Sequence, residues 1–306
     1  MLDQATELRK LVLRSMREPL ADGSPSPPLL VMCGAHGGVG VTTLTVHLAV
    51  ALSGQGCRVV LVDADLYRPA IASLCGLTGE AGIADVLAAR RDIHEVLQPG
   101  PGGVQVVAGA TAPSQPADWG EVAQQRLLRQ LKRLGRHADL IALDAGSAGH
   151  EVLRRFWRAA DEVVLVTTSD AQAVLEAYAM LKRLAETPSP AVLRLVVNRT
   201  LQSGTARDVH QRVCAASERF LERTLGLLGG VPDEPAWAAV RAPGLVWAMR
   251  DSECPAGVAL DAIAAQLIAA RHRAVTVARP CSGLVNEAFN SAGLAQPQPR
   301  FSPIDI

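Results

Sequence analysis

The chain has 306 residues, of which 49% are hydrophobic, so it can bury the core of one large domain or of two small ones. Its 30 basic residues balance its 30 acidic residues, which argues against attraction of the whole protein to nucleic acid or anionic lipid. The six cysteines are scattered without a CxxC pair, and no apolar run approaches the roughly 20 residues of a membrane span, so we expect reduced thiols in a cytosolic protein.

Residues 1–20 are predicted to form a short amphipathic helix. Asp3 is a suitable N-cap, and Leu8 and Leu11 lie on one face. Residues 21–28 are rich in proline, glycine and serine, which indicates a linker between this helix and a domain at 29–275. From the pattern alone, a helix docked on its own domain or a solvated cationic arm is the simpler interpretation.

A buried strand, a glycine-rich loop and an apolar helix follow one another after the linker. The apolar run Leu29–Met32 is typical of a central parallel strand that is covered on both faces. Four glycines follow it: Gly34, Gly37, Gly38 and Gly40. They allow the backbone to turn several N–H groups toward an anion at the start of the helix. This is the pattern of a phosphate-binding loop, but Val41 replaces the lysine that normally precedes its threonine. A simple glycine-rich turn is the alternative.

Two further buried strands end in carboxylates. The strand predicted at 58–62 is followed by Asp63 and Asp65, and the strand at 139–143 is followed by Asp144. Ligands of open α/β sheets bind at the carboxyl ends of parallel strands, where these side chains would lie. Asp144 has the form of a Walker B acid, which holds magnesium through water. Helix capping by Asp63 and Asp65 is the alternative interpretation.

The order of these motifs resembles the MinD/ParA family of P-loop ATPases, whose loop is written KGGVGKTT. His36 and Val41 stand where that family has its signature lysine and its phosphate lysine. The other six positions match: Gly37, Gly38, Val39, Gly40, Thr42 and Thr43. The resemblance covers residues 1–20 and 29–275. It implies the α/β P-loop NTPase fold, a three-layer sandwich around a mainly parallel sheet of about seven strands.

The same resemblance implies ATP and magnesium as cofactors. The residues that it assigns to the nucleotide are Gly37, Gly38, Val39, Gly40, Val41, Thr42, Thr43, Asn198 and Pro232. Thr42, Asp63 and Asp144 would hold magnesium, and Asp65 would position the hydrolytic water. Asn198 would read the adenine edge, because an amide donor and acceptor suit N6 and N7. The segment 67–69 also resembles bacterial tyrosine kinases related to MinD, but those carry a tyrosine-rich tail and this chain has only two tyrosines.

The N-terminus adds a more specific resemblance. Residues 3–9 are similar to the DQAxxLR motif of FlhG, a MinD-like regulator of flagellar number and placement. In that family the segment binds FlhF, a signal-recognition-type GTPase, and stimulates its GTP hydrolysis. The matching residues are Asp3, Gln4, Ala5, Leu8 and Arg9. Gln4 matches the motif glutamine that lies near the partner's active site, where a neutral amide is suited to orienting an attacking water.

Two other segments bear on partners. The helix predicted at 117–136 carries five basic residues, but a solvated face is favoured over a nucleic-acid patch because no aromatic residue is interleaved among them. The tail at 276–306 contains four prolines and is predicted to be flexible. Its one candidate for an amphipathic membrane helix, 283–294, has no lysine or arginine, so membrane contact is expected to be weak or absent.

The replacement of both family lysines, by His36 and Val41, is expected to weaken ATP binding and hydrolysis. In the family, ATP binding brings two subunits together, and each signature lysine crosses to the partner's phosphates. Each lost contact would cost roughly 1.5–3 kcal/mol, so phosphate binding is expected to weaken by about a hundredfold to ten-thousandfold. We therefore expect an FlhG-like regulator, cytoplasmic or recruited to the membrane or cell pole, with impaired ATP hydrolysis and homodimerisation. The alternative is a slow ATPase of polar localisation, in pilus or division positioning, in which protonated His36 partly replaces the signature lysine.

Overall fold

The computed structural model of the chain describes residues 26–65, 67–110, 119–147, 153–187, 189–221, 223–235, 237 and 254–278. The predicted N-terminal helix at 1–20, most of the linker and the tail from 279 onward, with its segment 283–294, lie outside the described residues. So do the residues predicted to bind a partner: Asp3, Gln4, Ala5, Leu8 and Arg9. Within the described ranges, no helix combines the length and the apolar character needed to cross a bilayer.

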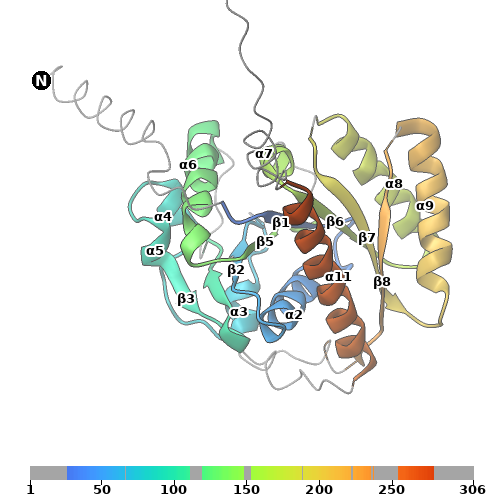
Figure 1. Cartoon of the computed structure of the whole chain (residues 1–306), viewed down its shortest axis with the longest axis horizontal. Helices are drawn as coiled ribbons and strands as arrows, with labels where there is room; N and C mark the ends of the chain where they lie inside the picture. The colour runs from blue at the N-terminus through green and yellow to red at the C-terminus, as the bar shows by residue number, and fades with distance from the viewer. Residues whose placement is uncertain are drawn as a thin grey trace, which may run out of the picture. The chain divides into compact units, whose positions relative to one another are not determined.

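One sheet of eight strands organises the domain, in the order β3-β4-β2-β5-β1-β6-β7-β8 (Figure 1). The strands are β1 (Leu29–Gly34), β2 (Val59–Asp63), β3 (Leu97–Pro99), β4 (Gln105–Val107), β5 (Leu140–Asp144), β6 (Glu162–Thr167), β7 (Val192–Thr200) and β8 (Gly226–Pro232). Every neighbouring pair is parallel except β3 and β4, so the predicted mainly parallel sheet is confirmed. The expected number of about seven strands omitted β3, which has three residues and ends in a proline.

Helices follow the strands along the chain. They are α2 (Val41–Gly54), α3 (Ile71–Cys75), α4 (Ile83–Leu87), α5 (Ile93–Val96), α6 (Glu121–Lys132), α7 (Leu153–Ala159), α8 (Ala171–Ala185), α9 (Thr205–Leu221) and α11 (Pro255–Ala278), with short 3₁₀ turns η1 (Pro101–Gly103) and η3 (Arg133–Arg136). The last helix continues three residues past the predicted domain end at 275. As far as Gln266 it belongs to the same compact unit as the sheet, where Gln266 donates to the Leu228 carbonyl.

The core is built on both faces of the central strands. All six residues of β1 are buried, which is why its sequence is an uninterrupted apolar run. One set of alternate β1 side chains joins a cluster with Leu127 of α6 and Phe156 of α7, together with Met180 of α8. The helix α2 contacts β1, β2 and β5. This burial fixes the carboxyl ends of the central strands, and therefore the loops that carry the expected site, in one place.

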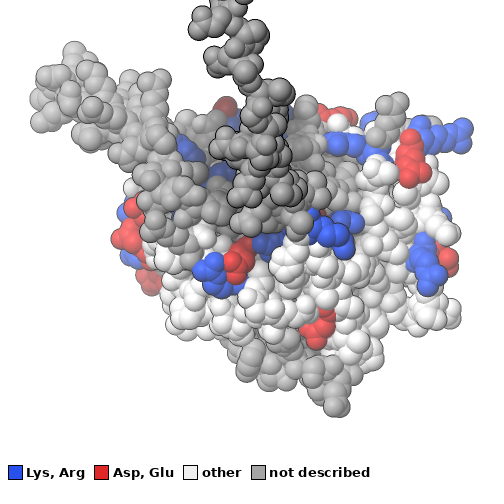
Figure 2. All heavy atoms as spheres, viewed as in Figure 1, with Lys and Arg blue, Asp and Glu red and all other residues white. Residues whose placement is uncertain are grey.

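Charged side chains of both signs are interspersed on the surface that Figure 2 shows. In the predicted basic helix, now α6 and η3, Arg126 donates to the Leu87 carbonyl and Arg129 to the Gln125 carbonyl. The neighbouring Arg155 of α7 pairs with Glu121 of α6. These contacts agree with the interpretation of α6 as a helix with a solvated, internally satisfied polar face, which remains a prediction with respect to nucleic acid.

Candidate functional site

The phosphate-binding loop lies between β1 and α2, as the sequence predicted. Gly38 and Gly40 both have φ of +85°, a backbone conformation that glycine adopts without strain. Gly40 occupies the N-cap of α2, so no side chain caps the helix, and the first turn of α2 contains no acidic residue. The free N–H groups and the positive end of the helix dipole are therefore available to an anion. Val41, Thr42 and Thr43 form the first turn of this helix.

A buried pair of carboxylates stands beside the loop. Asp63 and Asp144 end the neighbouring strands β2 and β5 and are register partners, with exposed fractions of 1% and 0%. Burial and the charge of Asp144 raise the pKa of Asp63 to about 7. Burial likewise raises the pKa of Asp144 to about 6, against the opposing effects of the Thr42 hydroxyl and the Gly146 N–H. Two buried carboxylates on neighbouring strands repel each other when both are ionised, so a bound cation would stabilise their charged forms.

This arrangement fits magnesium. Asp144 Oδ1 accepts a hydrogen bond from the Gly146 N–H at 3.0 Å, whereas Oδ2 is buried without a hydrogen-bond partner among the described residues. The Thr42 hydroxyl lies beside Asp144 and favours its ionised form. The described residues contain no group of three or more His, Cys, Asp or Glu side chains placed to hold a metal. Magnesium bound here would therefore use Thr42, Asp144 and Asp63 together with phosphate and water, which is its usual preference in phosphate sites.

Asp63 and Asp65 also shape the loop that follows β2. Asp63 Oδ2 accepts hydrogen bonds from the backbone N–H groups of Ala70 and Ile71, each at 3.0 Å. Asp65 Oδ1 accepts from Tyr67 at 2.9 Å and from Arg68 at 3.0 Å. The alternative interpretation of these acids, as caps of local backbone, thus describes part of what they do. The catalytic role assigned to Asp65 remains a prediction. Its Oδ1 already accepts two backbone hydrogen bonds within this turn.

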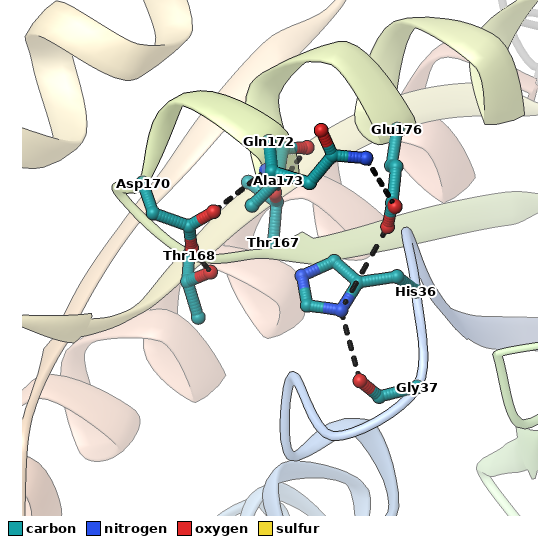
Figure 3. Close-up of polar contacts among 8 residues, drawn as sticks. All are labelled: His36, Gly37, Thr167, Thr168, Asp170, Gln172, Ala173 and Glu176. Carbon is teal, nitrogen blue, oxygen red and sulfur yellow. Dashed lines mark hydrogen bonds and ion pairs between the residues drawn. The ribbon is translucent and has the colours of Figure 1, made fainter.

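His36 points toward its own chain. Its Nδ1 lies 2.8 Å from the Gly37 carbonyl oxygen and 3.8 Å from Glu176 Oε2 of α8. Figure 3 shows the imidazole between these two groups, while Gln172 donates to Glu176 at 2.7 Å. On the same helix, Asp170 caps the N-terminus by accepting from the Ala173 N–H at 2.8 Å, and the Thr168 hydroxyl lowers the pKa of Asp170. His36 is therefore already engaged within one subunit.

The predicted adenine reader contacts the loop instead of facing open space. Asn198 of β7 is buried, and its amide nitrogen donates to the Val39 carbonyl at 2.8 Å. Its contact with the loop is so close that a Cβ on Gly40 would lie 2.6 Å from that nitrogen. Pro232 ends β8, and the segment beyond it returns to α2, where Trp237 stacks on His47 with ring centroids 4.1 Å apart. The amide oxygen of Asn198 keeps its acceptor capacity, so base recognition stays a prediction.

Three side chains near the loop were not assigned from the sequence. Arg68 and Ser147 approach Gly37 from the loops after β2 and β5. Glu176 faces His36 from α8. Only Arg68 left a signal in the sequence, as a basic residue close after the two acids of the second strand. Ser147 and Glu176 become neighbours of the loop only through the order of the strands.

Comparisons with known proteins agree with this geometry. The ParA family profile, described as NUBPL iron-transfer P-loop NTPase, matches residues 27–268. The antiactivator FleN of Pseudomonas aeruginosa is 31% identical over 72% of this chain and 79% of its own length. The flagellum site-determining protein YlxH of Helicobacter pylori is 25% identical over 76% of this chain and 78% of its own.

Solved structures show the same fold. The septum site-determining protein MinD of Pyrococcus horikoshii, complexed with Mg-ADP, superimposes with a TM-score of 0.63 at 19% identity, covering 79% of this chain and 96% of that one. The profile match extends over most of the chain, and the loop, the acid-ended strands and the strand order all occur together in it. The chain therefore belongs to the ParA/MinD family of P-loop NTPases.

Proposed function

We propose that this protein is an FlhG-like regulator of flagellar number or placement. The observation that carries the proposal is its similarity to FleN, an antiactivator, supported by the similarity to YlxH, which is named as a flagellum site-determining protein. The DQAxxLR-like segment at 3–9 points in the same direction. We further propose that this segment binds and stimulates an FlhF-like GTPase, with Gln4 near the partner's active site.

The nucleotide site of this regulator is proposed to be weakened but not dismantled. The glycine loop, the free N–H groups of α2 and the Asp63–Asp144 pair remain, while Val41 and His36 replace the two lysines. Val41 has an exposed fraction of only 6% and supplies no charge to a phosphate. His36 is directed to Glu176 of its own chain, which disfavours its crossing to another subunit. The expected result is nucleotide binding that is poorly coupled to dimerisation.

Two other functions compete with this proposal. A slow ATPase of polar localisation is favoured by the partnerless Asp144 Oδ2, which would be satisfied by magnesium. Iron transfer, named in the family profile, has less support, because none of the six cysteines lies in a CxxC pair. Cys33 is buried, and burial raises the pKa of its thiol to about 12, so it is not poised as a thiolate ligand.

The test is GTP hydrolysis by an FlhF-like GTPase in the presence of the full chain. We expect faster hydrolysis with the natural chain, and loss of most of that stimulation with Gln4→Ala. Glu7→Ala is the matched control, since it changes a neighbouring position that the motif leaves open. No stimulation by the natural chain, or equal stimulation by Gln4→Ala, would contradict the proposed role of this segment.

A further inference from the structure

The start of the phosphate-binding loop has an arginine beside it. A Cβ built on Gly37, the first glycine after His36, would lie 3.8 Å from Nη1 of Arg68 and 3.8 Å from Oγ of Ser147. Gly37 itself has no side chain, so the guanidinium approaches the loop backbone directly. This places a permanent positive charge at a loop from which both lysines have been lost.

The surrounding structure holds the backbone of Arg68 in place, while its side chain is exposed. β2 is separated from β1 by β5 alone, so the loop after β2 reaches across the end of β5 toward the phosphate-binding loop. Asp65 fixes the backbone of Tyr67 and Arg68, and Asp63 fixes the backbone of Ala70 and Ile71. Between them, Pro69 restricts the chain to one φ region. Arg68 is therefore presented from a turn that is tied down on both sides.

The guanidinium of Arg68 is also available. Several other arginines of the described chain are paired with carboxylates, among them Arg90 with Asp85 and Arg194 with Glu162. Across the described ranges, the Arg68 side chain takes part in no ion pair or hydrogen bond that would compete with a ligand. The loop beside it leads into α2, whose N-terminus carries no side-chain cap, and Asp144 Oδ2 at the end of the neighbouring β5 is buried without a hydrogen-bond partner among the described residues.

We propose that Arg68 is the phosphate-binding cation of this site, and that it contacts the phosphate groups of a bound nucleotide together with the N–H groups of the loop. The inference rests on the nucleotide binding that the proposed function retains. A guanidinium offers paired N–H donors that match phosphate oxygens, and the resulting charge-assisted hydrogen bonds are stronger than neutral ones. Ser147, whose Oγ lies at the same distance from that Cβ position of Gly37, is placed to donate its hydroxyl hydrogen to the same phosphate.

The proposal has a consequence for assembly. A cation that comes from the same chain satisfies the phosphate without a second subunit. Nucleotide binding then needs no partner to supply charge, and it no longer favours the dimer over the monomer through this contact. His36, whose Nδ1 lies 2.8 Å from the Gly37 carbonyl oxygen of its own chain, does not oppose this arrangement.

The experiment compares Arg68→Gln with the natural chain by calorimetric titration of Mg-ATP, and measures molar mass by light scattering before and after addition. We expect Arg68→Gln to bind about 10- to 100-fold more weakly and with a smaller dependence on salt. Arg68→Lys, which keeps the charge but loses the paired donors, should fall between the two. Arg207→Gln removes an exposed arginine from α9 and is the matched control, expected to bind like the natural chain.

Three outcomes would overturn the proposal. They are equal affinity of Arg68→Gln and the natural chain, equal losses in Arg68→Gln and Arg207→Gln, and no binding of Mg-ATP by the natural chain. Circular dichroism and thermal unfolding establish that each variant is folded. Arg68→Lys separates the effect of the positive charge from the effect of the paired N–H donors. The GTPase assay separates this inference from the proposed function. Arg68→Gln should stimulate the FlhF-like GTPase as the natural chain does, because the stimulating segment lies at residues 3–9.

Discussion

Replacing Asp144 by Asn tests whether the buried acid pair is built for a cation. The substitution removes one of two facing charges, while the remaining side-chain oxygen can still accept from the Gly146 N–H. The new amide would lie beside Asp63, to which it can donate. Without magnesium, we expect Asp144→Asn to be more stable than the natural chain at alkaline pH. Losing a predicted magnesium ligand would then stabilise the fold.

The direction of this stability difference follows from the pKa values of the two acids. In the folded chain the pKa of Asp63 is raised from 3.8 to about 7 and that of Asp144 from 3.8 to about 6. Between about pH 4 and about pH 7 the folded state therefore binds more protons than the unfolded state, and these two groups make the free energy of unfolding fall as pH rises. One pKa unit corresponds to about 1.4 kcal/mol, so we expect an advantage of about 2–4 kcal/mol for Asp144→Asn at about pH 8, shrinking toward about pH 5.

The assay is urea unfolding of both proteins across this pH range, with and without magnesium chloride. The difference between the two proteins is the quantity to follow, because other groups, such as His47, add their own pH dependence to both. Asp208→Asn, at an exposed position of α9, is the matched control and should leave the curve unchanged. Magnesium should stabilise the natural chain more than Asp144→Asn. The reasoning is refuted if Asp144→Asn is the less stable protein at about pH 8, or if its advantage does not depend on pH.

Three further predictions concern the loop and its helix. Val41→Lys restores an ammonium at the first residue of α2 and should tighten Mg-ATP binding about 10- to 100-fold in calorimetry; unchanged affinity would contradict the weakened site. Burial lowers the pKa of His47 to about 4, so the folded chain binds fewer protons than the unfolded chain below about pH 6.5 and loses stability as pH falls toward about 4. His47→Phe should lose less in thermal unfolding over that window, and parallel curves would refute this. Gly40→Ala should destabilise the chain by about 1–3 kcal/mol in urea, more than Gly56→Ala, because both glycines have positive φ but only Gly40 also meets Asn198.

Much of the fold could be predicted because the central strands are buried on both faces. Leu29–Met32 and the run before Asp144 have no polar alternation, so their sequences identify them as inner strands. The edge of the sheet left a weaker signal. β3 has only three residues, none of them buried, and pairs antiparallel with β4, so no hydrophobic periodicity marks it.

The candidate site was predictable to the extent that it is local in sequence. The glycine loop and Thr42 form one continuous segment, and Asp63 and Asp144 follow recognisable strands. The surroundings of His36 and Gly37 were not predictable, because Glu176 and Arg68 reach them from other loops and helices. Whether an acid caps local backbone or faces a metal also depends on the folded turn, as the contacts of Asp65 with Tyr67 and Arg68 illustrate.

The hydrogen bond from Asn198 to Val39 affects what a ligand must contribute on binding. Asn198 belongs to β7, which is separated from β1 by β6. The hydrogen bond therefore restrains the loop from an element other than β1 and α2, the strand and helix that the loop joins. The loop therefore gives up conformational freedom when the chain folds and not when a phosphate arrives. A preorganised loop spends less of its interaction energy on ordering, which raises affinity without any added charge. In a chain that has lost two lysines, this rigidity is a second means of keeping the loop competent for phosphate.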